Sequence, residues 1–312
     1  MEILISSINS IIPLLIIITV GYGLGKIFKI SDDFSKALSS ITFNALIPFH
    51  LFNSIYNGAS SLSISLKLIV IIFIIEVFSF FLSILFANKL YTKKERAGAL
   101  FQSVYRSNVV VFGLSIAQIL LDNTGATLYT LSLLFIIPMQ NFGTVVGIEY
   151  YQGKDNLKNW PKIIAKSIIN PNIISILLAL LLIVFRISLP EYIYKGVSDI
   201  AGIAAPLSLI LIGAGFNFND LIKDVKELSV AAFYKLILVP SLLVPIIISL
   251  NLTFPESFII ILMLASPTAS AVYPAVEQSG FDKSYAKEMI IFTQLVSIIT
   301  LTLWIYIIQI IT

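Results

Sequence analysis

The residues that could do chemistry lie inside long apolar stretches. In one of them, Pro267 and Pro274 bracket Thr268, Ser270 and Tyr273. Each proline lacks a backbone N–H and clashes with the preceding turn, so a helix through this stretch must break. Freed backbone groups are costly in hydrocarbon unless they face protein or a water-filled cavity. The pattern predicts a polar cavity at half-helix ends, whose N-termini favour an anion. The alternative is a kinked packing helix whose serines bond to its own carbonyls.

A second polar stretch contains Arg106, Ser107, Asn108 and Gly113 around the β-branched run 109–111. It has no proline, so these residues predict a softer break than the one at Pro267. Asn108 can donate and accept hydrogen bonds, which suits a carboxylate or carbonyl ligand. Arg106 lies about two to three turns inside its stretch, where a charge is expensive and usually functional. Its guanidinium could instead extend to the inner interface.

Three further ionisable side chains lie in apolar stretches. Glu76 must be protonated, paired or in a wet cavity, and it could couple protons to transport or serve as a structural partner of Arg106 or Lys235. Lys235 lies about two turns into its stretch and could also extend toward the interface. His50, beside Pro48, could titrate or be a packing residue.

Two adjacent amides, Gln140 and Asn141, follow Pro138 at mid-depth in another apolar stretch. They could reach a substrate carboxylate or hold helices together. Two G-x-x-x-G pairs predict close helix packing, namely Gly21 with Gly25 and Gly143 with Gly147.

The elements that must position these residues are membrane helices. The chain is 58% hydrophobic and 12% charged, and a soluble domain carries about 25% charged residues. A spanning helix needs about 20 mostly apolar residues. The apolar runs are too long for strands, and lipid forces hydrogen bonding within each segment. We predict an all-α polytopic membrane protein with ten spans: 10–28, 37–56, 66–88, 97–120, 125–150, 163–185, 197–218, 228–250, 257–276 and 285–311.

The basic residues alternate between the connections. Fifteen of the 20 Lys and Arg residues fall in connections on one side, and three, Lys67, Arg186 and Lys195, fall on the other. Because cytoplasmic loops carry the excess of Lys and Arg, this distribution predicts that both termini lie outside.

The two halves of the chain resemble each other weakly. A polar loop, YQGKDNLKNWPK, divides residues 1–153 from residues 154–312, with five predicted spans in each half. Pro48 and Pro206 are 158 residues apart, and Asn108 and Pro267 are 159 apart. The shared offset predicts a duplication, and an odd number of spans inverts the second half. Inverted repeats with broken helices are typical of secondary transporters. The alternative is that proline and glycine are common in membrane helices.

Composition excludes several kinds of chemistry. The chain has no cysteine and one histidine, which rules out disulfides, thiolate catalysis and multi-histidine metal sites. There is no HExxH, no GxSxG and no paired intramembrane aspartate. We therefore expect no catalytic residues, no cofactor, no metal and no nucleic-acid partner.

Five segments in this order resemble the auxin efflux carrier family, which includes the plant PIN carriers and many bacterial and archaeal members. They are NALIPFHLFNSI, RSNVVVFGLSIA, NPNIISILLAL, AAPLSLILIGAGF and SPTASAVYPAVEQSG. The resemblance implies ten helices, a scaffold subdomain and a transport subdomain, crossing fourth and ninth helices, and an elevator-like alternation. It also implies homodimers in many members and organic anions as substrates, such as auxin in plants and malate or malonate in some bacteria.

The resemblance extends to particular residues. It implies that Asn108 contacts substrate, that Gln140 contributes a polar group, and that Glu76 supports the site. Two positions depart from the family pattern. Ser115 stands where many members have proline, and Pro267 stands where plant carriers have asparagine, which argues against auxin itself as the substrate.

Together these observations predict a secondary active or facilitative transporter of a small carboxylate anion. We expect it to be a multi-pass protein of the plasma (inner) membrane. Proton coupling, sodium coupling and uniport all stay open. The alternatives are a sodium-coupled carrier of the bile-acid-transporter type, with the same inverted architecture, and a channel or receptor. The predicted substrate-binding residues are Asn108, Gln140, Asn141, Pro267, Thr268, Ser270 and Arg106, with Glu76, Lys235 and His50 as coupling or charge support.

Overall fold

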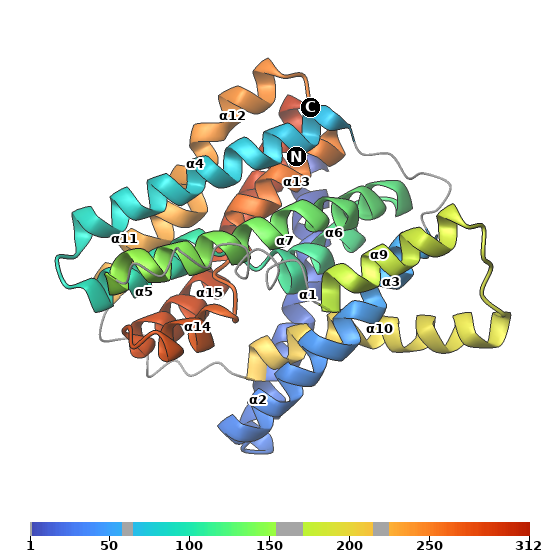
Figure 1. Ribbon diagram of the computed structural model, residues 1–312, viewed down its shortest axis with the longest axis horizontal. Helices are drawn as coiled ribbons and strands as arrows, with labels where there is room; N and C mark the ends of the chain where they lie inside the picture. Colours follow the sequence, from blue (N-terminus) through green and yellow to red (C-terminus); the bar gives the residue numbers. More distant parts are fainter. Residues whose placement is uncertain (1, 58–64, 154–170, 215–224) are drawn as a thin grey trace. The chain divides into compact units, whose positions relative to one another are not determined.

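The computed structural model describes residues 2–57, 65–153, 171–214 and 225–312. Helices make up most of the described residues, and these residues contain no strand. The predicted all-α architecture is therefore confirmed. The chain divides into two compact units, each assembled from three separate segments (Figure 1).

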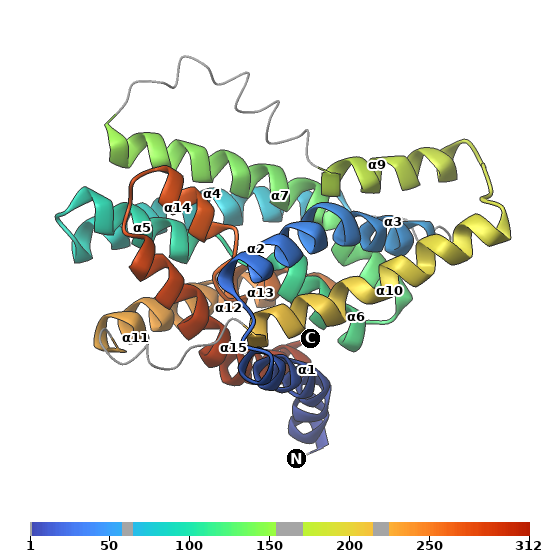
Figure 2. The same cartoon turned by 90° about the horizontal axis from the view of Figure 1, so that it is seen from below.

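Unit 1 comprises Met1–Ser65, Val110–Leu134 and Ile169–Phe216. Its helices are α1 (Glu2–Ile27), α2 (Asp32–Ile41), the π-helix η1 (Thr42–Leu46), α3 (Ile47–Asn57), α6 (Leu114–Leu120), the first part of α7 (Asn123–Gln152), α9 (Pro171–Val184) and α10 (Glu191–Ala214). Helix α3 packs against α9 and α10 (Figure 2). Helix α1 packs along α10, and Gly21 and Gly25 make this possible because a Cβ at either would collide with the α10 backbone at Ile210 or Ala214.

Unit 2 comprises Leu66–Val109, Phe135–Ile168 and Asn217–Thr312. Its helices are α4 (Leu66–Leu90), α5 (Lys94–Tyr105), the rest of α7, α11 (Val225–Phe233), the π-helix η6 (Tyr234–Leu238), α12 (Val239–Ser249), α13 (Phe254–Ala265), α14 (Val272–Gln278) and α15 (Lys283–Ile311). Helix α13 is the core of this unit, since every residue from Ser257 to Ala265 is buried. A helix that is apolar all round is buried on all sides, as the run SFIIILMLA predicts.

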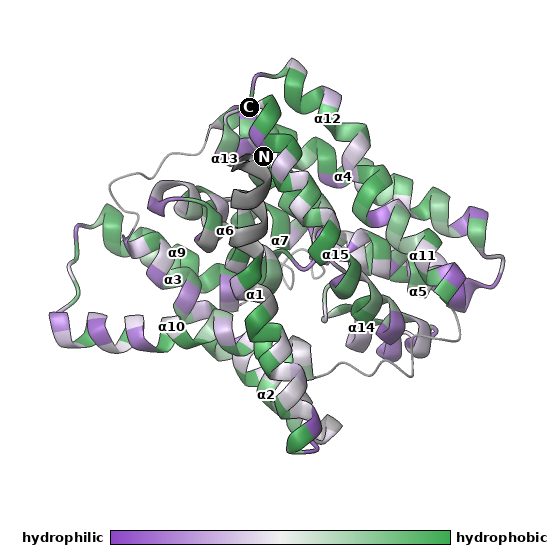
Figure 3. Cartoon of the chain, turned by 180° about the vertical axis from the view of Figure 1, so that it is seen from behind, coloured by the Kyte–Doolittle hydropathy of each residue, from purple (hydrophilic) through white to green (hydrophobic). Residues whose placement is uncertain are grey.

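Five stretches of helix are long and apolar enough to cross a membrane: Leu66–Leu90, Asn123–Gln152, Glu191–Leu211, Val225–Ser249 and Lys283–Ile311. Shorter apolar helices occupy Ile16–Ile27, Val109–Gln118, Pro171–Val184 and Phe254–Ala265. Helix α4 leaves Phe73, Phe81 and Leu85 more than half exposed, and its colours in Figure 3 are mainly those of hydrophobic residues. A large exposed apolar surface of this kind suits contact with lipid. The count of ten spans and the side of the termini stay predictions.

Candidate functional site: the crossing of two broken helices

Two helices of unit 2 stop at the same place. Helix α5 ends at Tyr105 and α13 ends at Ala265, and the extended segments that follow pair antiparallel at Ser107 and Thr268. The Asn108 N–H donates to the Pro267 carbonyl at 2.8 Å, and the Ala269 N–H donates to the Arg106 carbonyl at 3.0 Å. The predicted breaks therefore exist, and they cross.

The two breaks have different local causes. Ser266 precedes a proline and adopts φ −63°, ψ 145°, because the ring of Pro267 disfavours helical geometry in the residue before it. Arg106 adopts φ −84°, ψ 106° with no proline nearby. The sequence predicted a softer break here, and that prediction is wrong: three residues leave the helix before the π-helix η3 (Val109–Gly113) begins. The paired segment supplies the missing cause, since it accepts the Asn108 N–H.

The last carbonyls of α5 find partners from outside the helix. The Thr268 hydroxyl donates to the Ser103 carbonyl at 2.7 Å, and the Lys235 ammonium donates to the Val104 carbonyl at 2.9 Å and to the Ser107 hydroxyl at 3.0 Å. The final carbonyls of a helix have no partner within it. Thr268 and Lys235 thus complete the end of α5, and both are essentially fully buried.

Thr268 is satisfied at its backbone as well as at its side chain. Its N–H donates to the Thr293 hydroxyl of α15 at 3.0 Å. Pro267, which has no N–H, offers a carbonyl that already accepts from Asn108. These two predicted site residues therefore hold the crossing together. Ser270, by contrast, is exposed, and its carbonyl accepts from the Tyr273 N–H.

Arg106 is the charge at the crossing. One nitrogen of its guanidinium, Nη2, donates to the side-chain oxygen of Asn141 at 2.8 Å. Within the described ranges, no carboxylate lies within ion-pair distance of Arg106. The side chains of Arg106 and Asn141 are both partly exposed. The site therefore presents a guanidinium held by a neutral amide, with donors still free to meet an anion.

Asn108 offers a second unmet donor. Its side chain is 4% exposed, and its amide nitrogen has no hydrogen-bond partner among the residues that the structure describes. Leaving a buried donor unpaired costs about 1–3 kcal/mol. Side chains alternate along an extended segment, so Asn108 and Arg106 share a side opposite Ser107, whose hydroxyl faces Lys235.

Glu76 and Gln140 form a buried pair beside the crossing. The Gln140 amide nitrogen donates to the Glu76 carboxyl at 3.2 Å, and both side chains are less than 5% exposed. Among the described residues Glu76 forms no ion pair within 4.0 Å of Arg106 or Lys235. It does interact electrostatically with Lys235, so its role as a structural partner of that residue stays a prediction. The two adjacent amides thus have different partners: Gln140 hydrogen-bonds to Glu76, and Asn141 hydrogen-bonds to Arg106.

His50 belongs to the other unit. Its Nδ1 lies 3.0 Å from the Ala201 carbonyl, which joins α3 to α10 within unit 1. The remaining predicted site residues, from Glu76 to Ser270, all belong to unit 2. His50 therefore packs the core of unit 1.

An apolar cavity of about 480 Å³ lies within unit 2. It is lined by Phe73, Val77 and Phe81 of α4, by Tyr105 of α5, and by Pro138 and Phe142 of α7. Glu76 also borders the cavity, but its carboxyl is directed to Gln140. This cavity suits hydrocarbon and does not suit a carboxylate.

The glycines of α7 set the distance between α7 and α5. A Cβ at Gly143 would collide with the Tyr105 ring, and a Cβ at Gly147 would collide with the Phe101 ring. The Tyr105 hydroxyl donates to the Met139 carbonyl at 3.0 Å. The predicted close packing at Gly143 and Gly147 is confirmed, and it positions the residue immediately before Arg106.

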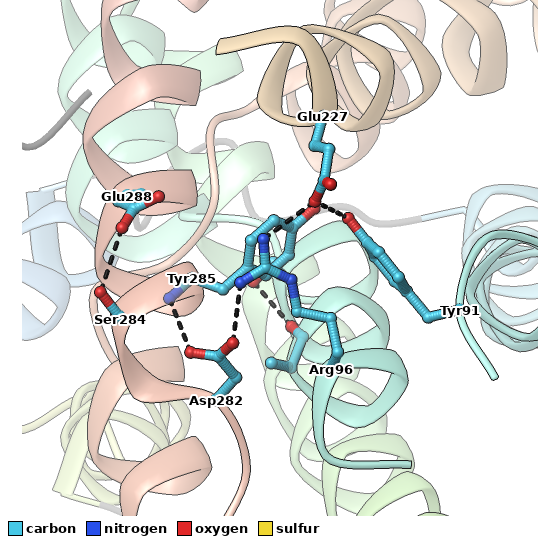
Figure 4. A network of polar contacts seen from close by, with 9 residues as sticks. Tyr91, Arg96, Glu227, Asp282, Ser284, Tyr285 and Glu288 are labelled. Atoms are coloured by element: carbon cyan, nitrogen blue, oxygen red, sulfur yellow. Dashed lines mark hydrogen bonds and ion pairs between the residues drawn. The ribbon is translucent and has the colours of Figure 1, made fainter. Parts of the chain in front are cut away.

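Sequence reasoning missed a second arginine, Arg96, at the other end of α5. Its guanidinium lies 2.7 Å from Asp282 and 2.9 Å from Glu227, and its carbon lies 4.0 Å from the centre of the Tyr285 ring (Figure 4). Tyr91 donates its hydroxyl to the same Glu227 carboxylate. The only signal in the sequence was the position of Arg96 in a connection rich in lysine.

The Arg96 cluster shifts the titration of its members. Burial opposes ionisation of Asp282, but hydrogen bonds from Arg96 and from the Tyr285 amide outweigh it, so that the pKa of Asp282 lies below its ordinary value. Burial, together with the hydrogen bond to Glu227, raises the pKa of the Tyr91 hydroxyl. The cluster is therefore built around an ionised Asp282 and a neutral Tyr91.

The fold and the crossing define a class: an integral, multi-pass helical membrane protein with two broken helices that cross inside one compact unit. Residues 156–305 match the family model described as membrane transport protein, Mem_trans. The match covers just under half of the chain and agrees with the predicted resemblance to the auxin efflux carrier family. No curated protein matches the sequence.

Proposed function

We propose that the protein is a secondary active or facilitative carrier of a small organic anion, which binds as a carboxylate at the crossing in unit 2. The observation that carries this proposal is Arg106, whose side chain hydrogen-bonds, among the described residues, to the neutral amide of Asn141 alone. A charge at membrane depth is expensive and marks a substrate or ion pathway. A carboxylate would neutralise it with a charge-assisted hydrogen bond, the strongest kind available to a side chain.

The neighbouring groups divide into those that contact the anion and those that hold the site. Arg106, Asn108 and Asn141 contact it, since the first two have donors to spare and the third fixes the guanidinium. Gln140 and Glu76 form the polar layer behind them. Pro267 and Thr268 act through the crossing, because their polar groups are already engaged there.

The division into units supports an elevator-type alternation. Arg106, Asn108, Asn141 and the crossing all belong to unit 2, which has its own buried core in α13. A site built within one unit can move with that unit without losing its geometry. Unit 2 then acts as the transport unit and unit 1 as the scaffold, which is how alternating access works when repeats or bundles move as bodies.

The test is flux in liposomes containing the purified protein. Saturable uptake of radiolabelled malonate, malate or a monocarboxylate is expected from the wild type, and loss of that uptake from Arg106→Gln. Arg186→Gln is the matched control, because Arg186 is an exposed arginine of the connection between α9 and α10. The proposal fails if no carboxylate shows saturable flux, and single-channel current without saturation would indicate a channel instead.

A further inference from the structure

We propose that the apolar cavity of unit 2 binds one acyl chain of a membrane phospholipid, and that this chain braces the C-terminal end of α5 from the lipid side. The binding of the chain is independent of the proposed function. Only the effect of the chain on anion binding rests on that function.

The cavity, of about 480 Å³, offers almost nothing to a polar ligand. Two of its lining side chains carry polar groups, and both groups have partners. The Glu76 carboxyl accepts from Gln140, and the Tyr105 hydroxyl donates to the backbone carbonyl of Met139. Protein interiors leave few voids larger than a water molecule. Water in an apolar void lacks hydrogen-bond partners, and such voids bind apolar ligands instead. The cavity is therefore suited to hydrocarbon.

The mouth of the cavity lies at the middle of a membrane span. Phe73, Val77 and Phe81 line the cavity and are also exposed at the surface. Their four-residue spacing places them in one row along α4. In the span Leu66–Leu90, seven residues precede Phe73 and nine follow Phe81. A helix of this length crosses the hydrocarbon core of a bilayer, so the row stands against hydrocarbon.

The depth of the mouth selects the occupant. Lipid headgroups and water-soluble molecules stay outside the hydrocarbon core. Another membrane helix, about 10 Å across, could cover the row on α4 but could not enter the cavity. A phospholipid acyl chain is narrow, flexible and already present at this depth. Met139, in the cavity wall, has a flexible thioether side chain that adapts to the position of such a chain.

The cavity also reaches the end of α5. Tyr105 lines it although the side chain is only 4% exposed, so a molecule from the bilayer meets Tyr105 through the cavity. Gly143 leaves room for the Tyr105 ring, since a Cβ there would collide with it. The ring of Phe80 meets the same ring edge-on, with centroids 5.6 Å apart. Because Arg106 follows Tyr105 directly, a chain in the cavity braces α5 where Arg106 leaves the helix.

The first experiment maps contacts with lipid chains. The purified protein is reconstituted in phosphatidylcholine vesicles in which one acyl chain carries a diazirine midway along its length. After illumination, mass spectrometry of the digested protein locates the adducts. Leu85 is exposed on α4 outside the cavity lining, so it reports general contact with lipid. Adducts are expected on both Leu85 and Tyr105. Labelling of Leu85 without Tyr105 would overturn the inference.

The second experiment narrows the mouth. Val77→Phe is expected to lose the adduct on Tyr105 and to keep the adduct on Leu85. Val70→Phe is the matched control, because Val70 is an exposed valine of α4, seven residues earlier and outside the cavity lining. Undiminished labelling of Tyr105 in Val77→Phe would overturn the inference, and if that variant does not fold, the wild-type map decides. Labelling of Tyr105 by a free diazirine fatty acid but not by the phospholipid would refute a phospholipid chain as the occupant.

The third experiment tests the effect on the anion site. Anion affinity of the wild type is measured through the anion-induced shift in unfolding temperature, in delipidated detergent solution and after phosphatidylcholine is added back. Affinity is expected to fall severalfold on delipidation and to recover with the phospholipid. Affinity that is the same in both conditions would refute the bracing of α5. Absence of anion binding in both conditions would refute the proposed function and leave the labelling results standing.

Discussion

Two arginines at opposite ends of one short helix have opposite surroundings. Arg96, in the first turn of α5, contacts two carboxylates and lies against the Tyr285 ring. Arg106, directly after the last turn, contacts the amide of Asn141, and the described part of the chain places no carboxylate beside it. Its neighbours in Figure 4 are Tyr91, just after α4, Glu227 in the first turn of α11, and Asp282 and Tyr285 at the start of α15.

The difference separates a structural charge from a charge that is available to a ligand. The guanidinium of Arg96 is neutralised by the protein, so its loss affects folding. The guanidinium of Arg106 is only oriented by the protein, so its loss affects binding. Both are arginines at the ends of the same helix, so the side chains that contact each arginine, and not its residue type, assign its role.

The largest effect is expected at Arg106. Arg106→Gln removes a charged donor that has no protein anion to lose, and a hydrogen bond to a charged group is worth about 1.5–3 kcal/mol. Anion affinity should fall roughly 10- to 100-fold, while unfolding without anion stays near the wild-type temperature. The anion-induced shift in unfolding temperature measures this. Arg106→Lys should retain part of the anion-induced shift. A full anion-induced shift in Arg106→Gln would contradict the role of Arg106 in binding the anion.

A smaller effect is expected when α5 is moved without a change in charge. Gly143→Ala pushes the Tyr105 ring aside, and overpacking of this kind costs about 1–3 kcal/mol. We expect a lower unfolding temperature together with a partial loss of anion affinity, because Tyr105 directly precedes Arg106. Gly23→Ala is the control, since nothing lies within 4 Å of a Cβ at that position. Unchanged affinity in a destabilised Gly143→Ala would show that the end of α5 does not position Arg106.

Arg96→Gln should have the reverse signature of Arg106→Gln. The contacts of Arg96 are partly exposed, with 21% of its side chain and 49% of the Glu227 side chain accessible, so each ion pair contributes at most about 1 kcal/mol. Two pairs and the aromatic contact together suggest a loss of about 1–2 kcal/mol. We expect an unfolding temperature a few degrees lower with unchanged anion affinity. Reduced affinity in this variant would contradict the structural role.

The smallest effect is the pH dependence of the Arg96 cluster. Asp282 has a pKa below the unfolded value of 3.8, so its contribution to stability is present above that value and is lost as pH falls through the folded pKa. The difference in unfolding temperature between the wild type and Asp282→Asn should therefore be constant near neutral pH and shrink below about pH 4. If the difference in unfolding temperature grew on acidification, it would contradict a lowered pKa of Asp282 in the folded protein.

Much of the site was predictable because its signals are local. Pro267 and Pro274 impose a break through the geometry of their own rings, and Gly143 and Gly147 predict close packing through the absence of a Cβ. The break at Arg106 could only be predicted as soft, because its cause is the carbonyl of Pro267, 159 residues away from Asn108. Thr268 looked like a ligand because a hydroxyl in an apolar run has no visible partner until the Ser103 carbonyl is placed beside it.

By itself the sequence determined that the chain is helical, that its apolar runs suit a lipid bilayer, and that polar groups gather where two of its predicted spans break. Those properties follow from composition, run length and proline, which act within a few residues. Only the tertiary structure decided which charges are satisfied. It placed Asp282 and Glu227 on Arg96, an amide on Arg106 and a carbonyl on Lys235. Electrostatic pairing depends on distances between segments far apart in the chain, and folding sets those distances.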